Sequence, residues 1–263
     1  MEWMKLTAPE FDSARKKARN LCIVPFGCIE KHSEHLPLGT DSLVAEAISI
    51  SAAEIEPAVV FPVLHFFENA AAMPFPGAIA LRWEVYFDLL ENICDEICRN
   101  GFRKILIVNG HGGNKSFIHN FLRNSLKSPK QYILYAIGPG SLVSKEFRKL
   151  VLDNEKGEHA SENETSILLY IHGNLVKMEN LPAEPGISQE RLEHLKPASS
   201  PLDWNAKYPT HYAGDSSMAT AEKGKKLFDE SVKNLADLIK RIKEDKVSAE
   251  LFEEFNSQAF ESR

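Results

Sequence analysis

The sequence has no run of about 18 apolar residues, the length that a membrane-spanning helix needs, so no transmembrane segment is expected. The first residues show neither the basic segment nor the apolar stretch of a secretory signal. Basic residues are in the minority, because 31 Lys and Arg stand against 37 Asp and Glu and leave a formal net charge of -6. This balance argues against a nucleic acid or an anionic membrane as the main partner.

Cysteine and the common catalytic motifs are also scarce. The chain has 4 cysteines, none in a CxxC pair, so buried free thiols are favoured over disulfides and a cytoplasmic location is expected. No GxSxG motif is present, which leaves no sign of a nucleophilic serine. The absence of GxGxxG and GxxxxGK[ST] argues against phosphate binding at a glycine-rich loop.

The residues that are present alternate between short apolar runs and longer amphipathic stretches. Buried strands are predicted at 21–26, 57–66, 104–110 and 131–138. Apolar residues at three-and-four spacing predict helices at 42–55, 82–101, 115–127 and 216–245, with the acidic tail a weaker candidate for another. This alternation predicts an α/β fold with a mainly parallel sheet, helices on both faces, and a single domain over residues 1–263.

The first cluster of titratable side chains follows the strand predicted at 21–26, at the edge where parallel sheets bind ligands. Glu30 and His32 are two residues apart, so their side chains point the same way in an extended chain, and Asp41 follows a Pro/Gly loop. These residue types suit a borderline divalent metal ion. The alternative is that Thr40 or Asp41 caps the next helix while Glu30 and His32 are solvated.

The second cluster is the turn "NGHGGN", which follows the strand predicted at 104–110. His111 is the strong metal-ligand type in this turn, and it stands at another carboxyl strand end. A single loop histidine is usually structural, but this one shares an edge of the sheet with the other candidate ligands. We therefore include His111 in the predicted metal site.

The third cluster is "GEHASENETS", where residues can be partly sorted by role. Ser161 and Glu164 match a capping box, so Glu164 is expected to satisfy backbone donors of the helix that begins there. This leaves Glu162 as the freer carboxylate and His159 as a freer imidazole. Four other histidines lack such neighbours and are expected on the surface or in the core, and one has no assignment. The four are His119, His172, His194 and His211, and the unassigned one is His65.

Together these motifs resemble the creatininase (creatinine amidohydrolase) family. The matching pieces are "PFGCIEKHSEHLPLGTD", "FPGAIAL", "GFRKILIVNGHGGN", "HASENETS" and "AGDSSMATAEKGKKLF", which in order cover most of residues 20–240. The resemblance implies a three-layer α/β/α fold, a dinuclear metal centre and hydrolysis of a non-peptide C–N bond in a small-molecule amide. It also implies a homohexamer.

By position, the resemblance implies a set of ligands for two divalent ions. Glu30, Asp41 and His111 would hold one ion, and His32 with the bridging Asp41 would hold the other. All of these ligands offer nitrogen or oxygen, so Zn, Mn or Fe is expected.

The rest of the site departs from creatininase itself, which has a Tyr-Glu pair where this chain has Gly112-Gly113. Since that Glu completes the second metal site, and relatives with Gly-Gly carry a Glu at the position of Glu162, the resemblance assigns Glu162 as the replacement ligand. His159 matches the family histidine that acts in proton transfer. A family His and Thr near the FPG motif are Ala72 and Ala78 here, so creatinine is not expected as the substrate.

The expected chemistry follows from this site. Two divalent ions can share a water, lower its pKa and polarise an amide carbonyl, while His159 protonates the leaving nitrogen. The predicted function is a metal-dependent amidohydrolase that acts on a small cyclic amide or formamide. The relatives also include a protease that trims a peptide cofactor precursor. The alternatives are a C–C hydrolase of an oxidised inositol on the same metals, and a non-catalytic metal-binding or scaffold protein.

Overall fold

The computed structural model describes residues 1–154 and 156–261. In this part of the chain a parallel sheet has the strand order β2-β1-β3-β4. Its strands are β1 (Leu21–Phe26), β2 (Val59–Val60), β3 (Lys104–Asn109) and β4 (Ile133–Ile137). The four predicted strands and their parallel arrangement are confirmed.

Among the described residues, helices and strands alternate as far as β4, and the remaining helices follow it without a further strand. They are α1 (Ala8–Lys17), α2 (Thr40–Ile55), α3 (Trp83–Arg99), α4 (Asn114–Asn124), α5 (Lys145–Val151), α6 (Glu162–His172), α7 (Asp203–Lys207), α8 (Ala221–Glu244) and α9 (Val247–Asn256). All four predicted helices and the helix in the acidic tail are confirmed. The long helix α8 begins later than predicted because Thr220 is its N-cap, with a side chain that accepts a hydrogen bond from the backbone N–H of Lys223.

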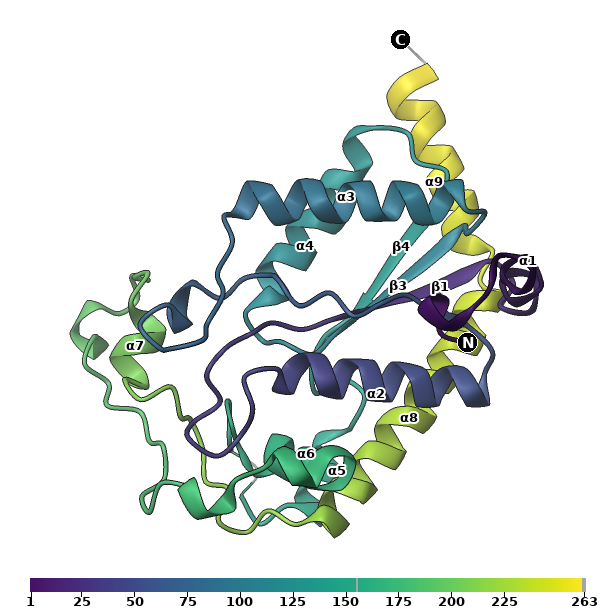
Figure 1. Cartoon of the computed structure of the whole chain (residues 1–263). Helices are drawn as coiled ribbons and strands as arrows, with labels where there is room; N and C mark the ends of the chain where they lie inside the picture. The colour runs from purple at the N-terminus through teal and green to yellow at the C-terminus, as the bar shows by residue number, and fades with distance from the viewer. Residues whose placement is uncertain (155, 262–263) are drawn as a thin grey trace.

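Two helical layers enclose the sheet. Figure 1 shows α3 and α4 on one face, and α2 and α8 with α5 and α6 on the other. Every residue of β1 is buried, and alternate side chains enter different cores: Leu21 packs in the core that includes α2 and α8, whereas Cys22 packs in the core that includes α3 and α4. The strand is therefore apolar throughout, as expected for a parallel sheet that is covered on both faces.

The predicted strand at 57–66 is much shorter than expected. Only Val59 and Val60 are assigned to β2, and a single later bridge joins Leu64 to Phe26. The backbone N–H groups of Phe61 and Leu64 still donate to the carbonyls of Ile23 and Pro25, so the segment stays beside β1 although the regular ladder ends at Val60. The chain then passes toward the loops beyond the carboxyl ends of β1 and β3.

The order of the strands creates a crevice at those carboxyl ends. From β1 the chain passes through α2 to β2 on one side, while β3 lies on the other side of β1. Loops that leave neighbouring strands in opposite directions separate at this point, which is where open α/β sheets bind ligands. Figure 1 shows α7 and its flanking loops beyond the same ends of the strands.

Within the described residues, we find no helix that combines the length and apolar character required to cross a membrane.

Candidate metal centre

Two neighbouring segments and a third that is distant in the sequence place acidic and imidazole side chains in the crevice. Glu30 and His32 lie in the loop after β1, Asp41 in the first turn of α2, and His111 in the turn after β3. All four are buried, with exposed fractions of 2%, 0%, 4% and 8% in that order. The alternative that Glu30 and His32 are solvated loop residues is therefore wrong.

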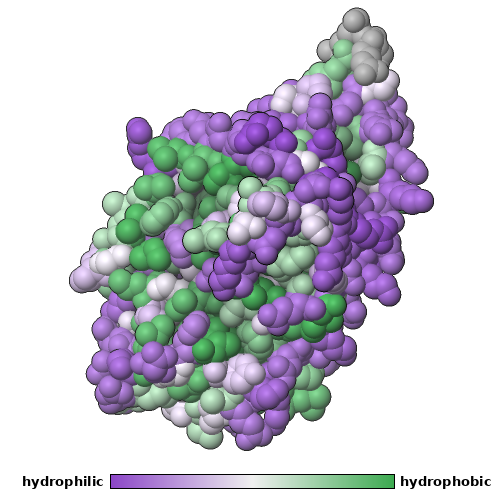
Figure 2. All heavy atoms as spheres, turned by 45° about the vertical axis from the view of Figure 1, so that its right-hand side comes forward, coloured by the Kyte–Doolittle hydropathy of each residue, from purple (hydrophilic) through white to green (hydrophobic). Residues whose placement is uncertain are grey.

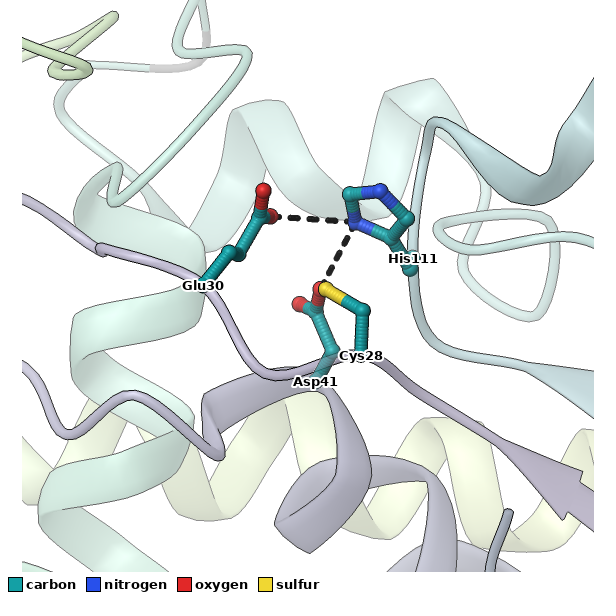
Figure 3. A group of neighbouring side chains, drawn as sticks. All are labelled: Cys28, Glu30, Asp41 and His111. Atoms are coloured by element: carbon teal, nitrogen blue, oxygen red, sulfur yellow. Dashed lines mark hydrogen bonds and ion pairs between the residues drawn. The ribbon is translucent and has the colours of Figure 1, made fainter. Parts of the chain in front are cut away.

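Asp41 is central to the cluster because its two carboxylate oxygens serve different imidazoles. Oδ1 lies 3.1 Å from His32 Nε2. Oδ2 lies 2.8 Å from His111 Nδ1, a contact that Figure 3 shows as a dashed line. Asp41 stands in the first turn of α2, where the helix dipole favours a negative charge. The N-cap position is held by Gly39, and no side chain caps the helix there. The alternative that Asp41 only caps the helix does not account for these contacts.

Glu30 has one occupied and one available oxygen. Oε2 lies 3.2 Å from His211 Nε2. The indole N–H of Trp204, which can only donate, gives a hydrogen bond to His211 Nδ1 at 3.1 Å, so His211 carries its proton on Nε2 and donates to Glu30. Oε1 is buried and accepts no hydrogen bond, although His111 Nδ1 is 3.0 Å away. An orphaned carboxylate oxygen of this kind is expected where a metal ion binds.

His211 is a residue of the site that the sequence analysis did not assign to it. It was expected on the surface or in the core, and with 2% of its surface exposed it is a core residue. Its backbone has a φ of 59°, in the left-handed region. It lies just after α7, at the end of a long stretch after α6 that has little regular structure. It lies 181 residues from Glu30 in sequence, so no local pattern could have joined the two.

The turn that carries His111 is held by side-chain amides and needs a glycine. The Asn109 side chain accepts from the His111 backbone N–H at 3.1 Å and donates to the His111 carbonyl at 2.7 Å. A Cβ added to Gly113 would lie 2.4 Å from His111 Nε2, which is too close for any side chain at that position with the ring in this orientation. Gly113 therefore allows His111 to present Nδ1 to Asp41 and Glu30.

The structure separates the two glutamates at the start of α6. Glu164 offers an oxygen to the donor set of His32 and Asp41. Glu162 instead accepts from the backbone N–H groups of Asp153 and Asn154 at 3.3 and 2.6 Å, and it forms an ion pair with Lys223. The expected placement of Glu162 among the metal ligands is thus not found.

The capping role predicted for Glu164 is confirmed, and it coexists with this position. The Ser161 side chain receives the backbone N–H at the third helical position, and Glu164 accepts from the Ser161 backbone N–H at 3.4 Å. A carboxylate has two oxygens and about four lone-pair positions, so one group can cap a helix and face a metal site. The sequence analysis gave each carboxylate a single role, and this is why it treated the capping Glu164 and a metal ligand as alternatives.

His159 lies at the opposite side of the cluster and presents one defined nitrogen to it. Nε2 is 2.7 Å from the Lys31 carbonyl, which can only accept, so Nε2 carries the proton. Nδ1 therefore has the free lone pair, and it lies 3.7 Å from Glu30 Oε1. The ring packs against His32 at 4.2 Å and edge-on against Trp204 at 5.8 Å between centroids.

The cluster divides into charged and neutral groups. Burial by itself would raise the pKa values of Glu30 and Asp41, but the imidazoles beside them hold both well below the usual range. Burial likewise opposes protonation of His32, yet Asp41 raises its pKa to about 9. Burial lowers the pKa of His159 to about 3, with the charge on His32 adding to the effect, and raises that of Glu164 to about 7.

The donor atoms are close enough together to hold divalent ions. The described residues contain three overlapping sets of donors, and within each set the donor atoms lie within 4.8 Å of one another. The sets are Cys28, Glu30, Asp41 and His111; Glu30, His32 and His159; and His32, Asp41 and Glu164. Carboxylates and imidazoles are the ligands of borderline metals such as zinc, manganese and iron. Together with the orphaned oxygen of Glu30, these sets fit a metal site.

One thiol accompanies the expected nitrogen and oxygen donors. Cys28 Sγ donates to Asp41 Oδ2 at 3.2 Å, and burial with the nearby carboxylates raises the pKa of the thiol well above its usual value. A protonated thiol is a poor metal ligand, so Cys28 acts here as a hydrogen-bond donor. The expectation of free thiols is confirmed for all four cysteines; Cys22, Cys28 and Cys94 are buried and Cys98 is partly exposed.

A cavity of about 420 Å³ opens over this cluster. Its wall includes Glu30, Asp41, His111, His159 and Trp204. A volume of this size accommodates a small organic molecule.

Comparison with known proteins gives matches along most of the chain. The sequence model of the family described as creatininase, creatinine amidohydrolase, matches residues 4–239. The chain is 28% identical over 235 residues to the mycofactocin precursor peptide peptidase of Mycolicibacterium smegmatis, covering 86% of this chain and 87% of that protein. It is 23% identical over 253 residues to the creatinine amidohydrolase of Pseudomonas putida, with 90% and 95% covered. For the 3-dehydro-scyllo-inosose hydrolase of Thermotoga maritima, the identity is 24% over 262 residues, with 88% and 79% covered.

Solved structures show the same fold. A candidate creatinine amidohydrolase from Bacteroides fragilis superposes with a TM-score of 0.76 at 28% identity, covering 87% of this chain and 91% of that one. A manganese form of creatininase superposes with a TM-score of 0.80 at 21% identity, with 91% and 97% covered. The three-layer α/β/α prediction is confirmed.

Proposed function

Because this chain belongs to the creatininase (creatinine amidohydrolase) family and is therefore a hydrolase, we propose that it is a metal-dependent amidohydrolase that cleaves the C–N bond of a small cyclic amide or formamide. We further propose that it works as a single domain, in a cytoplasmic homo-oligomer. The hexamer implied by the family resemblance is the assembly to test.

The observation that carries this proposal is the position of Asp41. Its two oxygens face His32 and His111 from opposite sides, at 3.1 and 2.8 Å. This is the arrangement needed for one carboxylate to serve two adjacent metal ions. Glu30 and His111 would complete one site with Asp41, and His32 and Glu164 would complete the other.

Two ions of zinc, manganese or iron at this position would activate a water and polarise the carbonyl of the substrate. The residues around them have separate tasks. His211 donates to Glu30 Oε2 and so keeps Oε1 directed at the site. Trp204 fixes the tautomer of His211 and forms part of the wall that limits the access of water.

His159 is the group that we assign to proton transfer. Its Nε2 proton is held by the Lys31 carbonyl, so the acid–base chemistry falls to Nδ1, which faces the cluster. In the metal-free protein its low pKa leaves the imidazole neutral, and Nδ1 can accept a proton. Donating that proton to the leaving nitrogen would return the imidazole to its starting form.

The proposal is tested by metal analysis together with a substrate panel. We expect elemental analysis to find about two divalent ions per chain after loading with Zn, Mn or Fe. The loaded protein is then assayed against lactams, hydantoin-like cyclic amides and formamides. Two further test substrates, 3-dehydro-scyllo-inosose and a short peptide, correspond to the activities named for the other relatives.

At most one ion per chain after loading would contradict the dinuclear site. Turnover of the inosose without any amide would replace the amidohydrolase with the C–C hydrolase. Two bound ions without turnover of any test substrate would favour a metal-binding protein that has no catalytic role.

A further inference from the structure

A second cavity adjoins the metal centre. It has a volume of about 510 Å³ and shares Gly112, Glu158 and Glu164 with the cavity over the cluster. Glu164 belongs to the donor set of His32 and Asp41, so the second cavity begins where the metal site ends. A ligand whose reacting group lies at the metal site can therefore extend into this second space.

The second cavity is cationic, in contrast to the acidic cavity over the metal ligands. Among the described residues, four basic side chains line it against two acidic ones. The basic residues are Lys145, Arg148, Lys149 and Lys156, and the acidic ones are Glu158 and Glu164. This excess of positive charge occurs in a chain with a net charge of -6. A cleft lined by one sign of charge concentrates ligands of the opposite sign.

The structure also explains how these cations come to face the cavity. Three of them lie on α5, whose apolar residues Phe147 and Val151 pack in the core, so the polar side of the helix forms the wall. Arg148 is partly buried and donates from Nη1 to the Gly140 carbonyl at 2.8 Å, which holds its side chain along the rim. Lys145, the first residue of α5, and Lys156, beyond the end of that helix, are exposed and add positive charge to the wall.

Gly112 leaves the junction between the two cavities open. A Cβ added to Gly112 would meet no atom within 4 Å, and its backbone φ is not in the left-handed region. The protein would thus tolerate a side chain at this position, but that side chain would stand in the junction. Gly112 lines both cavities, so its missing side chain is what keeps them in contact at this point.

We propose that the two cavities form one elongated substrate site, with an amide at the metal centre and a carboxylate or phosphate group of the same small molecule at the cationic wall. This inference rests on the proposed function, because it names the class of substrate for that site. The negatively charged group gives binding energy away from the reacting bond, and ion pairs with Lys145 and Lys156 set the orientation of the amide.

The test uses inorganic phosphate and succinate as probes, titrated by calorimetry into the full-length, metal-loaded protein. The variant is Lys145→Ala/Lys156→Ala. The matched control is Lys233→Ala/Lys240→Ala, which removes the same charge from exposed positions on α8 that line neither cavity. Both probes also bind metals directly, so the change between variants is the readout.

We expect at least one probe to bind about tenfold more weakly to the Lys145→Ala/Lys156→Ala variant, and within about twofold of wild type to the control. The probe that is affected tells whether phosphate or carboxylate is preferred. Equal affinities of both probes for both variants and the wild type would overturn the inference. A loss of equal size in the control would also overturn it, because the effect would then come from net charge alone.

A second measurement separates this inference from the proposed function. N-formyl-β-alanine and its neutral methylamide are compared as substrates, and a kcat/KM preference for the charged formamide that falls in the Lys145→Ala/Lys156→Ala variant supports the inference. Hydrolysis of both formamides at equal rates, unchanged in the variant, would overturn the inference and leave the proposed function intact. If no amide is hydrolysed but the lysine-dependent anion binding persists, the proposed function fails and the anion site stands.

Discussion

Exchanging either glutamate at the start of α6 for glutamine tests the division of roles between them. Glu162→Gln and Glu164→Gln are the same chemical change two residues apart, yet the structure predicts opposite results. Glu162→Gln is expected to lower stability while metal binding persists. Glu164→Gln is expected to lower metal content while the fold keeps its stability. The exposed Glu158, which belongs to none of the donor sets found here, gives the matched control Glu158→Gln.

The size of the first effect follows from the contacts of Glu162. Its carboxylate is fully buried and carries the charge that pairs with Lys223, whose side chain is 18% exposed. Removing one partner of a buried pair costs about 3–5 kcal/mol. A glutamine amide would in addition turn its NH2 group toward one of the two backbone donors, Asp153 or Asn154. Lys223 keeps Asp153 and some solvent contact, so we expect a loss of about 2–3 kcal/mol, or a Tm lower by roughly 5–10 °C.

The second effect has a different origin. Glutamine at position 164 still offers a carbonyl oxygen to the Ser161 N–H, so the cap costs at most about 1 kcal/mol when changed. Burial raises the pKa of Glu164 to about 7, so the metal-free fold gains little from its charge. A divalent ion requires that charge, and its loss should therefore remove about one ion per chain and abolish turnover.

Chemical denaturation of metal-free protein and elemental analysis of metal-loaded protein measure the two effects independently. The interpretation is refuted if Glu162→Gln loses an ion at unchanged stability, or if Glu164→Gln keeps both ions and full activity. The first outcome would restore Glu162 as the ligand that the family resemblance implies, and the second would remove Glu164 from the metal site. Glu158→Gln should match wild type in both measurements, and a loss there would mean that any charge removed near the cavity lowers metal affinity.

Three further predictions concern other parts of the site and its support. His159→Ala at saturating metal should slow turnover by roughly 100- to 10,000-fold with both ions retained, and a substrate with a good leaving group should recover much of this loss. Turnover by the variant at the wild-type rate would contradict a role of His159 in proton transfer. His211→Phe should lower metal affinity by roughly 10- to 100-fold in a competition titration with a chelator, whereas His211→Gln, which can still donate a hydrogen bond to its carboxylate partner, should recover part of it. Gly224→Ala should destabilise the fold by about 3 kcal/mol or more in denaturant unfolding, because its Cβ would lie 1.8 Å from the Ser166 carbonyl oxygen. The control Gly173→Ala should leave stability nearly unchanged, because its Cβ would meet nothing within 4 Å.

The sequence predicts those parts of the fold that depend on local pattern. Each buried strand is an apolar run, and each helix on a face of the sheet has an apolar stripe, so the layers and the carboxyl-edge position of the site follow from periodicity and topology. Glu30, His32, Asp41 and His111 are predicted together because all of them stand just beyond strands or at the start of the next helix. Their convergence requires only that neighbouring parallel strands end at the same edge.

The remainder of the site depends on how elements dock, which local pattern does not contain. Residues two apart on a helix point about 200° away from each other, so the rotation of α6 decides whether Glu162 or Glu164 faces the cluster. That rotation is set by the close contact of α6 with α8 at Gly224, and by Lys223, which holds Glu162 on the far side. His211 reaches the site from an irregular segment, and only the fold brings it to Glu30.

Figure 2 shows apolar groups gathered over the left and centre of the face in view, with polar groups along its right side and lower edge. Single exposed apolar residues such as Leu150 and Ile187 are normal on a folded protein. The buried cluster is therefore the more informative feature, since charged side chains are rarely buried without a partner or a metal ion.

The close approach of Gly113 to His111 has a consequence for how such sites can change during evolution. The Tyr-Glu pair of creatininase places a side chain at the position of Gly113, but here any Cβ would lie 2.4 Å from His111 Nε2. Restoring that glutamate alone would displace the imidazole before it added a carboxylate, so the substitution is harmful in this background and useful only after the ring has moved. A change that moves the His111 ring must therefore come before or together with a side chain at position 113, so the effect of that substitution depends strongly on the rest of the turn.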